Sequence, residues 1–256
     1  MLHKWVTRLI LTLFIVTAAV PVVGLVIFSI DNEGLVQWQS YTSLIADPTF
    51  QQSLVRSLEI SLLSVALTIL MITPPVWYGF LYSPRMLRLV EALSFIPFVL
   101  PAVVLGLAYV QFFSNPPLDL AGTPTLLPFA FSLFGMPYYI QSVLNRLRLM
   151  EARQFHEAAQ SLGSSAAASF WKVQFPLLLP GVLVGSVLVF SIGMGEFTIT
   201  QLTTGGSFMT LPIYLQVNFT NNPLSGAAMA VIAMLIAIIG VFAALGTFSR
   251  KRNGGP

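Results

Sequence analysis

Six long apolar runs constrain this chain more than any other feature of its sequence. They cover about residues 9–30, 57–82, 91–113, 124–144, 177–200 and 227–249. Each reaches the roughly 20 residues that a helix needs to cross the hydrocarbon core of a membrane. The runs are continuous rather than alternating, which favours helices over barrel strands. The sequence therefore predicts an all-α polytopic membrane protein with six transmembrane helices in a single domain, residues 1–256.

Charged residues are scarce across the whole chain. Only 8% of the residues are charged and 56% are hydrophobic, whereas soluble domains carry roughly 25% charged residues. There is no cysteine, which excludes disulfides and thiol chemistry. His3 and His156 lie far apart and flank the apolar runs, which argues against a histidine-based metal site. The small net charge of +3 is interpreted as a signature of membrane orientation and not of nucleic-acid binding.

The first run is interpreted as a spanning helix rather than a signal peptide. It is longer than the roughly 7–15 residues of a signal h-region, and no small-residue cleavage pattern closes it. Prolines inside other runs predict kinks, because neighbouring helices can satisfy the carbonyls that a proline frees. These prolines are Pro74, Pro75, Pro97, Pro101, Pro128 and Pro137.

The cations fall on one side of the predicted topology. Eleven of the twelve Lys and Arg residues flank the runs on alternate connections, and Arg56 is the exception. The eleven are Lys4, Arg8, Arg85, Arg88, Arg146, Arg148, Arg153, Lys172, Arg250, Lys251 and Arg252. The acids Asp31, Glu33, Asp47 and Asp119 lie on the opposite side. Because cytoplasmic loops are rich in Lys and Arg, both termini are predicted to be cytoplasmic.

Two external connections are long enough to hold structure of their own. Residues 31–56 are expected to form a short helix along the outer surface. Residues 201–226 are rich in turn-forming residues, but their part from Leu211 to Val217 is apolar. That part is expected to re-enter the membrane or to line a vestibule.

The cytoplasmic connection contains a segment, residues 153–176, with helical periodicity. One face is predicted to carry Phe155, Ala158, Ala159 and Leu162, and the other His156, Glu157 and Gln160. Gly163 is a helix stop, since glycine adopts the left-handed conformation without steric penalty. Ser164 or Ser165 is expected to cap a second short helix, and Pro176 to precede the fifth span. Such a bent pair of helices can dock into a partner's groove; the alternative is a helix that contacts lipid only.

The same segment resembles the EAA motif of ABC importer permeases. The pattern is Glu157-Ala158-Ala159, three residues, Gly163, nine residues, then Val173-x-Phe175-Pro176. It departs from the motif only in having Val173 and Phe175 where the family has isoleucine and leucine. The order of the runs along the chain is similar to the type I importer fold. The resemblance implies that the segment is a coupling helix inserted into an ATPase subunit, through Phe155, Glu157, Ala158, Ala159, Leu162, Gly163 and Pro176.

The resemblance also implies a set of partners. These are two ATPase subunits, a second permease that is identical or paralogous, and an extracytoplasmic solute-binding protein, all at a bacterial inner membrane. The chain has no G-x-x-x-x-G-K-[ST] loop of its own. We therefore expect it to be a non-catalytic subunit without a cofactor, with ATP and Mg²⁺ on the ATPase.

Polar residues near the outer ends of the runs are the candidates for the solute path. Glu196 is an ionisable group in the fifth run, and such groups usually face a bundle interior or an aqueous cavity. A structural role at a helix junction is the competing interpretation. The other candidates are Tyr109, Gln111, Thr200, Gln201 and Asn218, for which anchoring at the membrane interface is the competing interpretation.

Two further questions stay open at the level of the sequence. A self-contained secondary transporter is the main rival function, although such proteins often keep several buried ionisable groups, and this chain offers little beyond Glu196. The overall pattern most resembles permeases for polyamines, ferric iron, thiamine and phosphonates. The acidic external face slightly favours a polyamine-like solute, and an oxyanion of the sulfate or molybdate type is the alternative.

Overall fold

The computed structural model describes the backbone of residues 2–32, 35–36 and 38–253 of this chain. Side chains are described for residues 6–30, 38–236 and 238–239. The predicted cytoplasmic cations at positions 4 and 250–252, and the predicted external acids at positions 31 and 33, therefore lie outside the described side chains.

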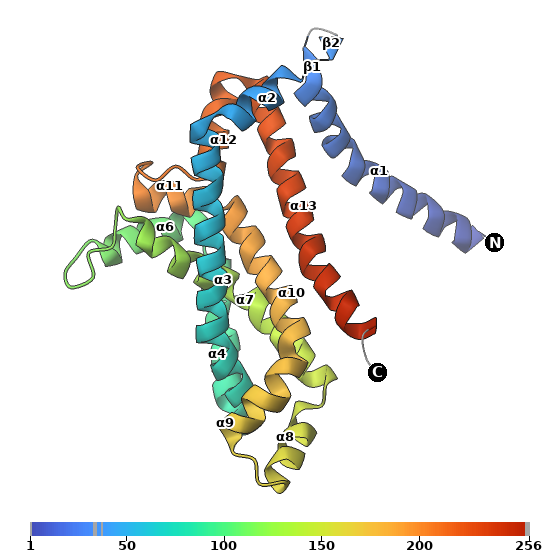
Figure 1. Cartoon of the computed structure of the whole chain (residues 1–256), viewed down its shortest axis with the longest axis vertical. Helices are drawn as coiled ribbons and strands as arrows, with labels where there is room; N and C mark the ends of the chain where they lie inside the picture. The colour runs from blue at the N-terminus through green and yellow to red at the C-terminus, as the bar shows by residue number, and fades with distance from the viewer. Residues whose placement is uncertain (1, 33–34, 37, 254–256) are drawn as a thin grey trace.

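Helices make up nearly all of the described chain (Figure 1), which confirms the all-α fold class. The long ones are α1 (Leu2–Ile30), α3 (Pro48–Tyr82), α7 (Leu127–Leu149), α10 (Phe175–Gly195) and α13 (Pro223–Asn253). The shorter α-helices are α2 (Gln39–Ala46), α4 (Pro84–Ser94), α5 (Ile96–Val99), α6 (Ala102–Phe113), α8 (Ala152–Ser161), α9 (Ala166–Ser169), α11 (Thr198–Thr204) and α12 (Leu211–Asn221). A 3₁₀ turn η1 (Pro124–Leu126), a π-helical turn η2 (Phe170–Gln174) and an antiparallel pair of two-residue strands, β1 (Asp31–Asn32) and β2 (Leu35–Val36), complete the fold.

Helices α3, α7 and α10 form the centre of the bundle and pack against one another. Glycines let their backbones approach closely, as small residues do in membrane helix pairs. A Cβ at Gly185 of α10 would lie 2.7 Å from the ring of Tyr139 on α7. A Cβ at Gly193 of α10 would lie 2.7 Å from the hydroxyl of Ser61 on α3.

Buried hydroxyls join α3 to α7 across this core. Thr68 Oγ1 lies 2.8 Å from Ser132 Oγ, and Thr73 Oγ1 lies 2.6 Å from Tyr139 Oη. All four residues are buried. The bonded hydroxyls form a polar stripe on the face of α3 that points into the bundle. Because they bond to α7, they fix which face of α3 points inward.

The kink predicted at Pro101 is confirmed, but it is a full break, so the prediction of one continuous helix over residues 91–113 is wrong. The run is divided into α4, α5 and α6, and the axes on either side of the break after Val99 differ by 104°. Leu100 is extended, with ψ 136°, because the residue before a proline avoids the helical region. Pro101 thus turns the chain, so that α6 lies across the bundle beside α11 (Figure 1).

The two ends of the bundle carry different short elements (Figure 1). Helices α2 and α12 lie at one end, while α8 and α9 lie at the other. The surface helix predicted in residues 31–56 is α2, and the apolar part of 201–226 forms α12. Helix α1 extends away from the bundle and contacts it through α13, and none of its most apolar 18-residue window is buried.

By length and composition, three described helices could cross a membrane. They are Val6–Ile30, Pro48–Tyr82 and Ala166–Gly195, and the bent pair of Pro84–Val99 with Ala102–Phe113 makes a fourth if it counts as one span. The fifth run was predicted to continue to residue 200, but α10 ends at Gly195.

Candidate functional site

The predicted bend in the 153–176 segment is present in the structure. Gly163 has φ +81°. Its N–H donates to the carbonyl of Gln160 at 2.9 Å, and the N–H of Ser164 donates to the carbonyl of Ala159 at 3.0 Å. This pair of bonds is a Schellman motif, which closes α8. Ser165 then caps α9 by accepting a hydrogen bond from the N–H of Ala168.

The two faces of α8 differ from the prediction in two respects: His156 is buried, and Ala159 is buried apart from Phe155, Ala158 and Leu162, with which it was predicted to share a face. His156 was assigned with Glu157 and Gln160 to a polar outer face, but it is only 4% exposed and shares the buried face with Ala152 and Ala159. Phe155 and Leu162 are 47% and 90% exposed. Glu157, Ala158 and Gly163 are exposed as well. The outer face therefore combines two large apolar side chains with one carboxylate and the bend.

His156 is buried because its ring is bonded on both sides. Its Nδ1 lies 3.0 Å from Ser169 Oγ, and its Nε2 is hydrogen-bonded to Tyr82 Oη. Trp77 packs edge-on against the imidazole with 5.8 Å between ring centroids, and its Nε1 donates to Gln174 Oε1. We call His156, Tyr82, Ser169, Trp77 and Gln174 the anchor cluster. It joins α8 to the last turn and a half of α3 and to the α9–η2 segment.

Arg153 adds a second attachment beside the anchor cluster. Its Nη2 donates to the carbonyl of Phe80 at 3.0 Å, and its guanidinium lies 5.7 Å from the centre of the Phe80 ring. Helix α8 is thus held against α3 through both a buried and an exposed contact.

Pro176 lies within a helix rather than before one. Residues 166–195 form one long helix, in which η2 is a π-turn where the N–H of Phe175 donates to the carbonyl of Phe170. The wider turn precedes Pro176, which has no N–H to continue the ladder. Helices α9 and α10 are therefore continuous through η2.

Glu196 is not inside a helix, contrary to the prediction for the fifth run. It occupies the break between α10 and α11 with ψ 111°. Its Oε1 accepts a hydrogen bond from the N–H of Ile199 at 2.8 Å, and its carbonyl accepts one from the Thr200 hydroxyl at 3.0 Å. The carboxylate thus caps the start of α11, where the helix dipole favours negative charge.

The remaining predicted path residues are not gathered at one place. Tyr109 and Gln111 of α6 line a shared groove with Asn115. Thr200 is fully buried, and Gln201 follows it on α11. Asn218 lies on α12, where its Nδ2 donates to the carbonyl of Tyr214 at 3.0 Å.

A larger polar group was missed by the sequence reasoning. A groove of about 690 Å³ lies between α5, α7 and α10 and has Gln141, Ser142, Asn145 and Arg146 along its α7 wall. The i, i+4 spacing of Gln141, inside an apolar run, and Asn145, directly after it, was the available signal. We call this hollow the α7 groove.

A polar contact also fastens the opposite end of the bundle. Tyr214 of α12 donates a hydrogen bond to the carboxylate of Asp47, which also caps α3 by accepting from the N–H of Thr49 at 2.8 Å. The bond from Tyr214, helped by those from Thr49, lowers the pKa of Asp47 below its ordinary value of 3.8.

Comparisons with known proteins find similarity along most of the chain. Residues 62–253 match the family described as "Binding-protein-dependent transport system inner membrane component". The molybdenum transport system permease protein ModB of Mycobacterium tuberculosis is 29% identical over 253 residues, covering 94% of this chain and 92% of that protein. The spermidine/putrescine transport system permease protein PotC of Escherichia coli K12 is 26% identical over 232 residues, covering 88% and 86%.

The fold is also found in solved structures. A chain of a bacterial ABC transporter involved in the import of the acidic polysaccharide alginate superposes with a TM-score of 0.65 at 17% identity, covering 97% of this chain and 96% of that chain. The same holds for the bacterial alginate ABC transporter in complex with an alginate pentasaccharide-bound periplasmic protein, with a TM-score of 0.66 at 16% identity, covering 99% and 97%. At these identities the likeness concerns the fold.

Proposed function

The chain belongs to the family of binding-protein-dependent transport system inner membrane components, and from this premise we propose that it couples a solute path to a separate ATPase through its 153–176 segment. In this proposal the path is enclosed by this chain and a second permease. ATP and Mg²⁺ bind to the ATPase subunits, and an extracytoplasmic binding protein delivers the solute.

One observation carries the coupling role: the outer face of α8 exposes Phe155 and Leu162 while its inner face is fixed by the anchor cluster. Large apolar side chains on a protruding, rigid helix suit insertion into a partner's hydrophobic groove. A few side chains that fill pockets at the centre of an interface carry most of its binding energy. A helix held this firmly can also transmit the motion of its partner.

The anchor cluster supports a mechanical path from the partner to the core. His156 bonds to Tyr82 at the end of α3 and to Ser169 of α9, which continues through η2 into α10. Helices α3 and α10 are two of the three central helices. A force on α8 therefore reaches α3 and α10 together. ATP binding can shift the bundle between two arrangements only if the ATPase contacts α8 differently in each of them.

The topology is part of the proposal. We place six spans in the membrane with α8 and both termini on the cytoplasmic side. Basic residues within α4, the last turn of α7, α8 and η2 support this orientation, and Figure 1 shows the end of α7, α8 and α9 together at one end of the bundle.

A small charged solute is the proposed substrate class. Relatives of this chain are named for molybdenum transport and for spermidine/putrescine transport. Both an oxyanion and a polyamine are thus consistent with the family. The charges that line the path would decide which of the two is transported.

Co-purification of the ATPase tests the coupling role. We expect Leu162→Asp, at a side chain 90% exposed, to reduce the ATPase recovered with the tagged permease at least tenfold, since an interface hot spot contributes more than about 1–2 kcal/mol. Leu118→Asp is the matched control, because Leu118 is exposed in the loop after α6, far along the chain from α8. Equal recovery of the ATPase with both variants contradicts the proposal.

A further inference from the structure

The α7 groove has one stripe of polar residues in an otherwise largely apolar lining, along the part of α7 that leads to α8. Its lining includes Tyr138, Gln141 and Asn145 of α7, and the opposite wall is formed by Pro180, Val184 and Leu188 of α10. The α7 residues recur every three to four positions and end at Leu149, one turn before α8 begins. The groove therefore runs along α7 toward the end of the bundle that carries the 153–176 segment.

The two carboxamides in the groove have no hydrogen-bond partner in the described part of the chain. Gln141 is half-buried and Asn145 is exposed, and neither side chain bonds to another described residue. An amide that faces hydrocarbon without a partner costs several kcal/mol. Gln141 lies within the predicted fourth span and Asn145 directly after it, so their unpaired amides indicate contact with water or with a polar solute at the inner end of that span.

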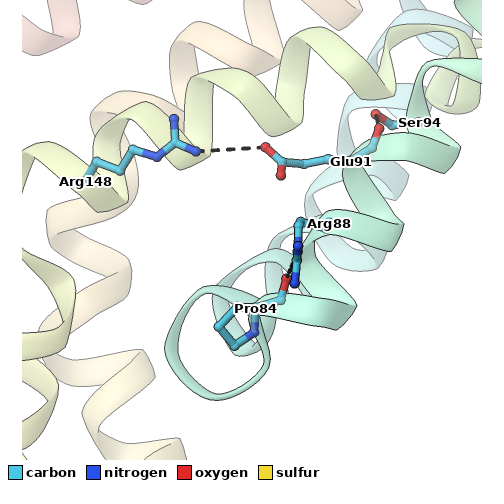
Figure 2. Close-up of polar contacts among 5 residues, drawn as sticks. All are labelled: Pro84, Arg88, Glu91, Ser94 and Arg148. Carbon is cyan, nitrogen blue, oxygen red and sulfur yellow. Dashed lines mark hydrogen bonds and ion pairs between the residues drawn. The ribbon is translucent and has the colours of Figure 1, made fainter.

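The charge of the groove is positive. Arg146 is held in place because its Nε donates to the carbonyl of Leu177 at 2.7 Å, and no acid is among the residues that line the groove. Glu91 on α4 is 4.0 Å from Arg148 (Figure 2), so its charge is balanced outside the groove. Among the described residues, Arg146 has no carboxylate partner.

The rest of the wall keeps this charge effective. Phe98 packs edge-on against Tyr138 with 5.5 Å between ring centroids. Apolar walls lower the local dielectric, so one cation acts more strongly there than in water. Guanidinium groups suit oxyanions in particular. The neutral amides add only weak hydrogen-bond donors. Binding therefore stays weak enough for a solute to leave the groove again.

Resting on the proposed function, we propose that the α7 groove is the inner section of the solute path and that it admits a small oxyanion through Gln141, Asn145 and Arg146. A polyamine would meet Arg146 as a like charge with no acid to offset it. The phosphate of an anionic lipid has the same chemistry as a small oxyanion, and the test has to separate the two.

Because the chain contains no cysteine, single cysteines report on the groove without background. The test uses the complete transporter in phosphatidylcholine nanodiscs, with Asn145→Cys in the groove and Asn221→Cys on exposed α12 as the matched control. Each is labelled with an anionic (sulfonatoethyl) and a cationic (trimethylammonium-ethyl) methanethiosulfonate. The ratio of the two rates cancels the intrinsic reactivity of each thiol.

We expect the anionic-to-cationic ratio at position 145 to exceed that at position 221 about tenfold, and molybdate to slow labelling at 145 only. Equal ratios overturn the anion preference, and an Asn145→Cys thiol that no reagent reaches overturns the aqueous path. Protection by phosphatidylglycerol but not by molybdate identifies a lipid site and also overturns it. ATPase recovery from the same samples tests the proposed function separately, since it depends on α8 and not on the groove.

A second variant tests the groove in transport itself. Asn145→Asp preserves shape and adds a negative charge, so we expect uptake of molybdate into proteoliposomes to fall at least about tenfold. Asn221→Asp should leave uptake within about twofold. Undiminished uptake by Asn145→Asp, with ATP-dependent transport intact, rejects the groove as the oxyanion path while leaving the permease role standing.

Discussion

The anchor cluster and the α7 groove are built from similar side chains but use them differently. Both contain a glutamine, an aromatic ring with a polar atom and a nitrogen-rich side chain. In the anchor cluster these groups bond to one another, as Trp77 does to Gln174 and His156 to Ser169. In the groove, Gln141 and Asn145 bond to no described residue. The bonded groups of the anchor cluster hold α8 in place, whereas the carboxamides of the α7 groove lie open to a solute.

The largest expected effect comes from removing the histidine at the centre of the anchor cluster. His156→Ala leaves the buried Ser169 hydroxyl without its hydrogen-bond partner and creates a cavity beneath α8. We therefore expect the free energy of unfolding to fall by about 2–3 kcal/mol. Thermal unfolding in detergent measures this. Gln160→Ala on the exposed face of α8 is the control and should change it by less than about 0.5 kcal/mol. A similar result for both variants would mean that the cluster does not hold α8.

The same substitution in the two regions separates pairing from solute contact. Gln174→Leu leaves the indole N–H of Trp77 without its acceptor and should destabilise the protein by about 1–2 kcal/mol. Gln141→Leu breaks no bond within the chain and should leave stability within about 0.5 kcal/mol, yet lower the uptake rate. Unfolding and uptake measured on both variants check this. If Gln141→Leu proved the more destabilising, the comparison between the regions would be wrong.

The contact between Asp47 and Tyr214 extends the comparison to a titratable pair. Tyr214→Phe should cost about 1 kcal/mol at neutral pH, because the carboxylate loses a hydrogen bond. The pKa of Asp47 is depressed below 3.8 in the folded state. The stabilisation is therefore present above that value and is lost as the pH falls through the folded pKa.

Unfolding of the wild type and of Tyr214→Phe at neutral and at acidic pH tests that sign. The difference between the two proteins should shrink as Asp47 becomes protonated. A difference that grows toward low pH would show that the bond does not depend on the carboxylate.

The smallest expected effect is at the pair of Glu91 and Arg148 on the surface of α4 and α7 (Figure 2). The two groups are 4.0 Å apart and the Arg148 side chain is 56% exposed. Surface pairs of this kind contribute about 0–1 kcal/mol and are screened by salt. Arg148→Ala should therefore change the unfolding temperature little, and any change should vanish in high salt. A large, salt-insensitive loss would indicate that this pair belongs with the buried anchor contacts.

Local chemistry made part of this arrangement predictable from sequence. The left-handed turn at Gly163 and the cap at Ser165 depend on a few neighbouring residues, so they could be predicted. The position of His156 could not, because its partner Tyr82 is 74 positions away and periodicity treats an imidazole as an outward polar group.

Apolar composition proved a weaker guide to where helices end. It indicated the 91–113 and 177–200 runs but carries no information on ψ. Pro101 therefore predicted a kink but not the 104° break at Leu100, and the cap made by Glu196 fell inside a predicted helix. The Pro101 ring and the carboxylate of Glu196 are the physical causes of these two interruptions.

The sidedness of α8 offers the most direct test of the coupling role. Leu162→Cys places a single thiol at a side chain that is 90% exposed in a chain without cysteine. We predict that a membrane-impermeant maleimide labels it in inside-out vesicles stripped of the ATPase, and that rebinding of the ATPase blocks the reaction. Labelling from the outer side of intact cells, or labelling that the ATPase leaves unchanged, would contradict the placement of α8 at the ATPase.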